Sequence, residues 1–376
     1  MLDIIKQVTD QFDIKGNLLD IKCKNNGNIN KTYIGTYKMM DGSTNRFIFQ
    51  KINTTVFKEP YKLMKNISGI TDWIEDKTKL LNDNKPCLKV IKTKSGNSLA
   101  TIEDFNGEKM YYRAYNCIDN AITYDRSLDP NIVYNSGKAF GHFQKLLIDY
   151  PIEKVEESIP DFHNTKLRYI KFLNDIKEDV CKRCESVKDE IELVKKNESI
   201  ISSITDLVDN NLIPIRITHN DTKVNNVMID IDTKDYLTVI DLDTVMLGSC
   251  LYDYGDGIRS SASNALEDEE DLAKVYLDNN LFEKYTDGYL SEMAPFLNEY
   301  EVSNLGRSIE VLTLELAMRF LNDYINGDTY FKTVKDKHNL IRARNQLKLL
   351  SDIQSKMEYI NNYTNFSYKK RMNLNE

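Results

Sequence analysis

Residues 217–230 read ITHNDTKVNNVMID, and this stretch decides how the rest of the chain is interpreted. The apolar residues at its two ends predict short strands, and the polar residues between them predict a tight loop. Within that loop His219, Asp221 and Asn226 stand in the order H-x-D-x-x-x-x-N. The carboxylate of Asp221 and the amide of Asn226 therefore project from one loop.

A second acidic motif, VIDLD at residues 239–243, follows this loop. Asp241 comes directly after a predicted strand and 15 residues after Asn226. In protein kinases the loop Asp positions and deprotonates the acceptor hydroxyl, while the Asn and the later Asp bind the magnesium that holds the ATP phosphates. We therefore predict that Asp221 is the catalytic, substrate-binding carboxylate. Asn226 and Asp241 are predicted to bind magnesium, and Asp243 is a candidate for a further ligand.

Each motif alone also fits a simpler, structural interpretation. Residues 219–221 could form a polar turn, and residues 241–244 could end a strand with side chain-to-backbone hydrogen bonds. The combined order, spacing and strand-loop-strand setting favours catalysis. For His219 alone the structural role is favoured, because a carboxylate beside the acceptor hydroxyl is the better base. We expect its imidazole to hold the loop by hydrogen bonds.

The composition of the chain disfavours several classes of protein. Its 376 residues are 41% hydrophobic and 29% charged, as in a soluble globular protein long enough for two lobes. A net charge of -8 disfavours nucleic acid and an anionic membrane as partners, since both favour clustered Lys and Arg. No run of 18 apolar residues is present, and the six cysteines are spread along the chain. Because the N-terminal residues form an amphipathic pattern broken by charge, we also expect no secretory signal. We expect a cytoplasmic protein that binds small molecules.

Strand and helix patterns predict two lobes and an α+β fold class, with the two-lobed architecture of a protein kinase. Residues 1–118 form the expected nucleotide-binding lobe, because alternating runs and turn signals predict antiparallel strands, with a helical insertion at residues 56–81. Residues 119–376 form the expected helical lobe, which holds the catalytic loop and the acceptor site. Three short strands are expected within residues 213–242.

A short hinge at about residues 113–120 should join the lobes. The helices of the large lobe are expected at residues 134–149, 162–196, 270–298, 302–326 and 333–361.

Several motifs resemble a known family. HNDTKVNN (219–226), VIDLDTV (239–245) and YDYGDGIR (252–259) resemble the aminoglycoside phosphotransferase superfamily of small-molecule kinases. Three further segments resemble one branch of this superfamily, the N-acetylhexosamine 1-kinases. These segments are RFIFQKINTTVFK (46–58), IPDFHNT (159–165) and RFLNDYINGDTYFK (319–332). The resemblance implies magnesium-dependent transfer of the ATP γ-phosphate to the anomeric hydroxyl of N-acetylglucosamine or N-acetylgalactosamine.

The first hairpin of the small lobe, NNGNINKTYIGTY (25–37), occupies the position of a phosphate-covering loop, although it is poor in glycine. Its backbone and polar side chains could meet phosphate or sugar hydroxyls. Asn30 and Thr32 are predicted to contact the nucleotide, and Asn28 the substrate. An ordinary Asn-Gly turn explains the same residues equally well.

The third strand departs from the kinase pattern. Protein kinases place there a Lys that pairs with the α- and β-phosphates. Here FIFQK at residues 47–51 puts Gln50 at that position, and Lys51 would point to the opposite face of the strand. Either Gln50 binds the nucleotide as a neutral donor, or a bulge turns Lys51 inward.

The resemblance also implies substrate-binding residues in the large lobe. Asp253 is expected to support the catalytic loop. Arg259 is expected to hydrogen-bond a sugar hydroxyl or the amide oxygen, with a plain salt bridge as the alternative. Arg319 lies among apolar residues and needs a partner, for which Glu315 is available four residues earlier. The candidates for sugar recognition are Arg319 and Tyr330, with His163 and Asn164 as weaker ones.

Two other functions remain compatible with these residues. A related kinase acting on choline, homoserine or an aminoglycoside would need an aromatic or acidic pocket for its cationic acceptor. A catalytically silent nucleotide-binding or scaffold protein would explain the missing lysine of the third strand. The presence of both catalytic motifs argues against a protein without catalytic activity.

Overall fold

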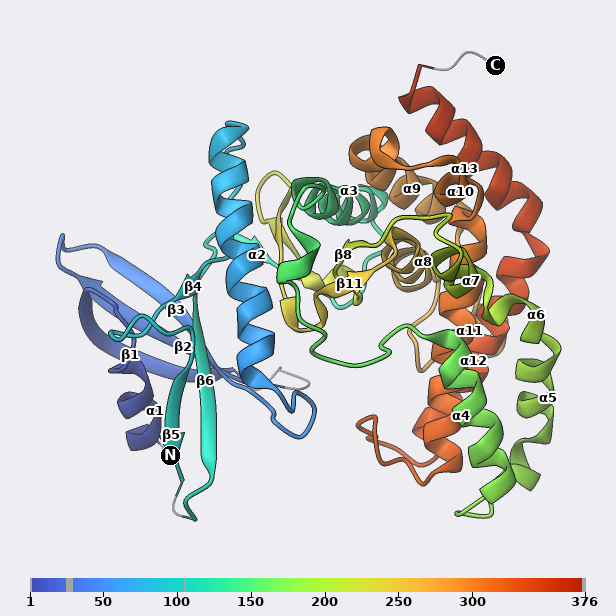
Figure 1. Ribbon diagram of the computed structural model, residues 1–376, viewed down its shortest axis with the longest axis horizontal. Helices are drawn as coiled ribbons and strands as arrows, with labels where there is room; N and C mark the ends of the chain where they lie inside the picture. Colours follow the sequence, from blue (N-terminus) through green and yellow to red (C-terminus); the bar gives the residue numbers. More distant parts are fainter. Residues whose placement is uncertain (1, 25–29, 105, 374–376) are drawn as a thin grey trace. The chain divides into compact units, whose positions relative to one another are not determined.

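The structure, a computed structural model, describes residues 2–24, 30–104 and 106–373. The described chain divides into two compact units (Figure 1). The first comprises Met1–Ala121, Asp149–Pro160 and Leu237–Met246, and the second comprises Ile122–Ile148, Asp161–Tyr236 and Leu247–Glu376. The VIDLD motif therefore belongs to the first unit, whereas the loop with Asp221 belongs to the second.

The first unit is built on an antiparallel sheet. Among the described residues it has six strands, in the order β1-β2-β3-β6-β4, with β5 paired to β6. Their bounds are Gly16–Lys24 (β1), Lys31–Met39 (β2), Thr44–Lys51 (β3), Val90–Ile91 (β4), Ala100–Glu103 (β5) and Lys109–Asn116 (β6). Helix α1 (Leu2–Thr9) contributes Ile5 and Val8 to an apolar core with Tyr37 and Phe49 of the sheet. This core fixes which face of β3 is buried under α1.

Helix α2 (Pro60–Leu80) anchors the two segments that return to the first unit, which contain the 3-10 turns η1 (Ile152–Lys154) and η4 (Leu242–Thr244). Its buried Asn66 accepts the N–H of Glu156 (2.8 Å) and donates to the carbonyl oxygens of Glu156 (2.7 Å) and Val245 (3.3 Å). A single side chain thus holds both segments, and Val245 lies just after the VIDLD motif.

Helices make up most of the second unit. Their bounds are Pro130–Leu146 (α3), Thr165–Glu178 (α4), Lys188–Lys196 (α5), Glu198–Ile201 (α6), Ser203–Asp209 (α7), Cys250–Ser261 (α8), Asn279–Met293 (α9), Glu299–Ser303 (α10), Leu305–Ile325 (α11), His338–Ser355 (α12) and Met357–Arg371 (α13). Helix α11 runs beside α12 and α4 (Figure 1), and Phe172, Leu314, Phe320 and Leu350 from these helices share one apolar core.

Short strands frame the predicted catalytic loop. β8 (Arg216–Thr218) precedes residues 219–226 and β9 (Val227–Asp230) follows them, so the predicted strand-loop-strand arrangement is confirmed. The other short strands are β7 (Ala121–Ile122), β10 (Tyr236–Val239) and β11 (Met246–Gly248). The antiparallel-sheet lobe and the helical lobe also confirm the predicted α+β fold class.

Two local predictions differ from the structure. The hinge predicted at residues 113–120 begins too early, because β6 continues to Asn116 and pairs with β3 as far as that residue. The helix predicted over residues 162–196 is interrupted, since Asp179 adopts a left-handed conformation (φ 39°) that ends α4. Among the described residues, none of the helices combines the length and apolar character needed to cross a bilayer.

Candidate active site

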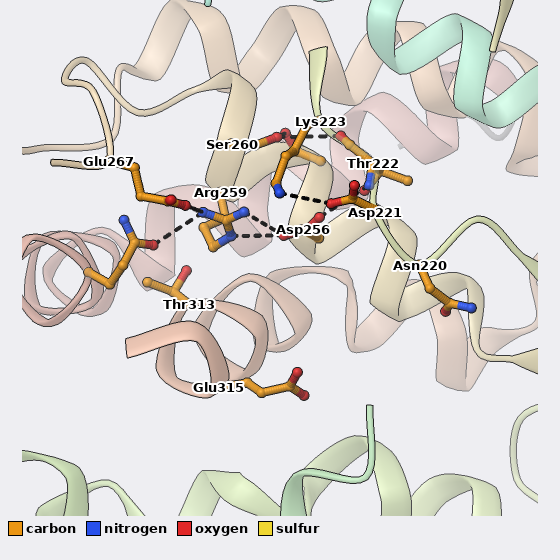
Figure 2. Close-up of polar contacts among 12 residues, drawn as sticks. Asn220, Asp221, Thr222, Lys223, Asp256, Arg259, Ser260, Glu267, Thr313 and Glu315 are labelled. Atoms are coloured by element: carbon orange, nitrogen blue, oxygen red, sulfur yellow. Dashed lines mark hydrogen bonds and ion pairs between the residues drawn. The ribbon is translucent and has the colours of Figure 1, made fainter. Parts of the chain in front are cut away.

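The loop between β8 and β9 carries the predicted catalytic carboxylate. The side chain of Asp221 is 28% exposed, so a ligand can reach it. Lys223 Nζ lies 3.0 Å from its Oδ1, and Asn226 Nδ2 donates to its Oδ2 (3.0 Å) and to its main-chain oxygen (2.9 Å). Figure 2 shows the Lys223 side chain directed at Asp221. A cation and an amide of the same loop therefore orient this carboxylate.

Helix α8 fixes the backbone of this loop through Asp253. This fully buried carboxylate accepts the N–H groups of His219 (2.9 Å) and Asn220 (2.7 Å) and an N–H of the Gln144 amide (2.7 Å). The hydroxyl of Thr222 donates to the main-chain oxygen of Asp253 (2.7 Å). The residues on both sides of Asp221 are thus bound to one turn of α8.

One turn further along α8, Asp256 supports the same loop. Its Oδ2 accepts the N–H of Thr222 (3.1 Å), and its Oδ1 accepts from Nε of Arg259 (2.8 Å). Arg259 is 3% exposed and also donates to Glu267 (3.2 Å) and Gln346 (3.3 Å), as Figure 2 shows for Asp256 and Glu267. The guanidinium expected to meet a sugar hydroxyl is therefore engaged in a buried ion pair in this structure.

The charges around the loop keep Asp221 ionised. Burial raises the pKa of Asp221, but the charge and hydrogen bond of Lys223 outweigh it, with smaller contributions from His219 and Asn226. The pKa of Asp221 consequently lies below its ordinary value. An ionised carboxylate can orient a substrate hydroxyl and then accept its proton.

A cationic and aromatic cluster is centred on Arg319 of α11; we call Phe162, Arg168, Glu315, Arg319 and Phe331 the Arg319 cluster. The Arg319 guanidinium carbon lies 5.6 Å and 5.5 Å from the ring centroids of Phe162 and Phe331. Buried Glu315 lies 3.7 Å from Arg319 NH1 and 3.6 Å from Arg168 Nε. Two guanidinium groups share one carboxylate, so the cluster has net positive charge.

His163 connects the Arg319 cluster to the catalytic loop. Its Nδ1 lies 3.0 Å from Oε1 of Glu315, and its Nε2 lies 3.2 Å from the main-chain oxygen of Asn220, the residue before Asp221. Burial raises the pKa of Glu315, but His163, Arg168 and Arg319 outweigh burial and lower it to about 2. The cluster is therefore held next to the loop by an ionised carboxylate.

Other predicted substrate residues lie in different settings. Asn164 caps the N-terminus of α4, where its side chain accepts the N–H of Leu167 (3.1 Å). Tyr330 is 65% exposed, and its ring meets the ring of Phe331 edge-on at 4.8 Å. Asn28 lies outside the described residues.

The VIDLD motif presents its two carboxylates differently. Asp241 is exposed and has a left-handed backbone conformation (φ 61°, ψ 56°) at the start of η4. Asp243 is buried: Oδ1 accepts from NH1 of Arg113, and Oδ2 accepts from the Asn30 amide (2.6 Å). Both oxygens of the predicted additional metal ligand thus have protein partners in this structure.

Gln50 lies in the same buried chain of contacts. Its amide donates to the hydroxyl of Thr32 (3.1 Å) and its oxygen accepts from Nε of Arg113 (3.0 Å). The ladders that join β3 to β2 and β6 run without a register shift from Phe47 to Lys51. The bulge needed to turn Lys51 inward is therefore not found in this described segment, and Gln50 shares its face with Thr32 and Arg113.

The predicted metal ligands carry groups that suit magnesium. Asn226 uses its amide nitrogen on Asp221, which leaves the amide oxygen as the group for a cation. Asp241 offers an exposed carboxylate. Magnesium prefers such hard oxygen ligands and usually takes few of them from the protein, beside water and substrate phosphates. Asn226 and Asp241 each offer one oxygen ligand of this kind.

Two residues of the site were not predicted. Lys223 lies between two predicted site residues, so the sequence contained a local signal for it. Asp256 is not one of the two, because it stands in the motif YDYGDGIR, for which the resemblance implies support of the catalytic loop. Arg113 had no sequence signal, because its alternating strand YYRAY does not reveal that Gln50 and Asp243 lie beside it.

The chain is similar to known proteins in sequence and in fold. Residues 72–290, more than half of the chain, match the phosphotransferase enzyme family. The structure of a microcompartment-associated aminopropanol kinase superposes with a TM-score of 0.57 at 14% identity, covering 96% of this chain and 99% of that chain. An amicoumacin kinase in complex with AMP-PNP and Ca2+ has a TM-score of 0.56 at 13% identity, with 94% and 93% covered. An ethanolamine kinase of Plasmodium vivax has a TM-score of 0.50 at 14% identity, with 87% and 82% covered.

At such identities the solved structures show a shared fold alone. The family match is independent of them and includes the loop around Asp221 together with the VIDLD motif and α8. The chain therefore belongs to the phosphotransferase enzyme family.

Proposed function

We propose that this protein is a small-molecule kinase that transfers the γ-phosphate of ATP to the anomeric hydroxyl of N-acetylhexosamines. The observation that carries the proposal is the setting of Asp221, an accessible, ionised carboxylate whose loop is fixed by Asp253 and Asp256. Such rigid support suits a reaction that depends on positioning and charge neutralisation.

In the proposed reaction Asp221 orients the acceptor hydroxyl and takes its proton. The hydroxyl oxygen bonds to the γ-phosphorus while the bond from that phosphorus to the bridging oxygen breaks, and ADP leaves. Asn226 and Asp241 would hold magnesium, which supplies positive charge to the phosphates. An anomeric hydroxyl is more acidic than the other sugar hydroxyls, so a carboxylate with a lowered pKa remains an adequate base.

The Arg319 cluster supports an N-acetylated sugar as the acceptor. The guanidinium donates hydrogen bonds that an amide oxygen accepts, and its salt bridge to Glu315 is long at 3.7 Å. Aromatic rings beside it suit the apolar face of a sugar. The resemblance of residues 319–332 to N-acetylhexosamine 1-kinases points to the same acceptor, with Arg319 and Tyr330 as its contacts.

The same cluster disfavours the cationic acceptors of the rival proposal. Choline, amino alcohols and aminoglycosides carry ammonium groups, which a net positive cluster repels. The aminopropanol and ethanolamine kinases to which the fold is similar act on such amines, so the acceptor has to be tested directly.

The test is magnesium- and ATP-dependent ADP release with N-acetylglucosamine, N-acetylgalactosamine, glucose, choline, ethanolamine and kanamycin, followed by phosphorus NMR of each product. An anomeric phosphate formed from the N-acetylated sugars is the expected result. Turnover on the amines alone would retain kinase chemistry and overturn the sugar assignment. An Arg319→Met variant should raise KM for the N-acetylated sugars far more than KM for ATP.

A further inference from the structure

Arg113 of β6 is a buried cation that the proposed reaction does not use. Its side chain is 1% exposed. NH1 pairs with Oδ1 of Asp243, Nε donates to the Gln50 amide oxygen (3.0 Å), and the guanidinium carbon lies 5.3 Å from the ring centroid of Tyr115. Burial lowers the pKa of Arg113, but Asp243 and, to a smaller degree, Tyr115 and Asp241 outweigh burial and raise it. The guanidinium is therefore charged and committed to its carboxylate partner.

Arg113 lies directly opposite the position where protein kinases carry their lysine. In the β3–β6 ladder Gln50 is the partner of Arg113, and Gln50 aligns with that lysine. The positive charge missing at the position of Gln50 is thus present one strand away, on the same face of the sheet. At 1% exposure the guanidinium cannot touch a phosphate directly, so any effect on the reaction passes through its protein partners.

The partner that connects Arg113 to the predicted metal ligand is Asp243, which follows Asp241 by two residues. Asp243 is held at both carboxylate oxygens, by Arg113 and by the Asn30 amide, whose own oxygen accepts the N–H of Asn53 (3.0 Å). On the other side of η4, Val245 is held by Asn66 of α2. The turn that presents Asp241 is therefore fixed on its C-terminal side at two points.

Asp241 itself needs such support. A left-handed backbone conformation costs free energy for a residue with a side chain, so the contacts of the surrounding turn help to maintain it. The contacts of Asp243 can supply this constraint.

We propose that Arg113 is a positioning residue for the metal site: through Asp243 it holds the turn that presents Asp241 to magnesium. The inference rests on the proposed function. It assigns Asp243 as an anchor of this turn, while Asp241 remains the ligand that the VIDLD motif offers to the metal.

The competing explanation is that the Arg113–Asp243 ion pair only stabilises the fold. The two explanations predict different effects when both partners are replaced. Removing one partner leaves an unpaired buried charge, whereas replacing both partners by apolar residues of similar size is often neutral for stability. A structural role is therefore rescued by the double replacement Arg113→Met with Asp243→Leu. A positioning role is not, because the double variant lacks the directional contacts that hold the Asp241 turn.

The experiment measures, by calorimetry, how much magnesium is needed for half-maximal ADP binding to the full chain. We expect the folded double variant to need about ten- to a hundredfold more magnesium, the usual effect of losing an outer partner of a metal ligand. Affinity for adenosine without metal should stay within about twofold, because adenosine carries no phosphate to engage the metal. Arg46→Met, which removes an exposed arginine of β3, is the matched control and should leave the magnesium requirement unchanged.

Arg113→Gln is the second variant, in case the double replacement does not fold. It keeps a hydrogen-bond donor toward Asp243 but removes the charge, and it should raise the magnesium requirement as well. A wild-type magnesium requirement in either folded variant overturns the inference and leaves the proposed function intact. A wild-type protein that binds no magnesium nucleotide at all overturns both.

Discussion

The pKa values of two carboxylates in the second unit, half-buried Asp221 and buried Asp253, are shifted in opposite directions. The surroundings of each carboxylate explain the direction of its shift. For Asp253 burial raises the pKa and outweighs the charge of His219 and the backbone N–H groups that it accepts. For Asp221 the ion pair with Lys223 outweighs burial and lowers the pKa. Asp253 is enclosed and holds a loop, whereas Asp221 is open enough to meet a substrate.

Replacing Asp221 tests its role most directly. Asp221→Asn should lower kcat about a hundred- to ten-thousandfold, the usual contribution of a positioned general base, while ADP affinity changes little. Steady-state kinetics and calorimetry measure the two quantities. Asp235→Asn, the same chemical change at an exposed position in the β9–β10 turn, is the control. Unchanged turnover in Asp221→Asn would remove Asp221 from the mechanism.

Glu315 gives a prediction about acid stability. Its pKa in the folded protein is lowered to about 2 from an ordinary value near 4.5, so its stabilising contribution is fully present above pH 4.5 and is lost as the pH falls toward 2. The difference in free energy of unfolding between wild type and Glu315→Gln should therefore shrink as the pH falls from 6 toward 3. Urea unfolding at several pH values measures this difference.

Glu310, on the same helix α11, provides a control whose pKa is shifted in the opposite direction. Burial raises its pKa in the folded protein, against the charge of Arg307. Its ionised form is therefore unfavourable in the folded state, and wild type should gain stability relative to Glu310→Gln as the pH falls. The same slope for both variants would contradict the assignment of Glu315 as an ionised anchor.

At the scale of elements, the helix contacts of the second unit depend on small residues. A Cβ atom at Gly288 of α9 would lie 2.0 Å from the main-chain oxygen of Tyr134 in α3, and one at Gly255 of α8 would lie 2.4 Å from that of Ser308 in α11. Both distances are too short for two non-bonded atoms, so these helices approach at their backbones. Because α8 carries Asp253 and Asp256, the packing of α8 on α11 also positions the catalytic loop.

Gly288→Ala should destabilise the protein by about 1–3 kcal/mol, because α9 has to move away from α3 to admit the methyl group. Denaturant unfolding gives the free energy. Asn280→Ala, at an exposed position of the same helix, should change it by less than about 0.5 kcal/mol. An equally small effect at Gly288 would show that the α3–α9 contact is not tight.

Most elements could be predicted from the sequence, and the errors have local causes. Strand β2 follows from its alternation, because Tyr33, Gly35 and Tyr37 repeat on one buried face. Helix α11 follows from the length of its apolar run, since most of its residues are buried. The break after α4 does not, since a single left-handed residue, Asp179, ends the helix within a run that remains helical in pattern. The hinge predicted to begin at residue 113 overlaps a strand, because residues 113–116 pair with β3 and belong to β6.

For the whole molecule, ligand binding should appear as stability. If the proposed function holds, magnesium with ATP at a hundred times its Kd should raise the free energy of unfolding by about 2.7 kcal/mol, because the ligand binds only the folded state. Calorimetry with and without EDTA measures the increase, which should become much smaller when the metal is removed. Full stabilisation by ATP in EDTA would contradict metal-dependent binding.

The sequence alone determined the fold class and the family of this protein, because motif order, spacing and periodicity are properties of neighbouring residues. Such local patterns predicted the loop with Asp221, the VIDLD motif and the alternating strands of the sheet. The partners of these groups were decided by the tertiary structure. Arg113 and Asp243 are 130 residues apart, and His163 and Glu315 are 152 apart. Such pairs depend on how strands and helices pack, since burial makes each charge require a partner that the sequence does not identify.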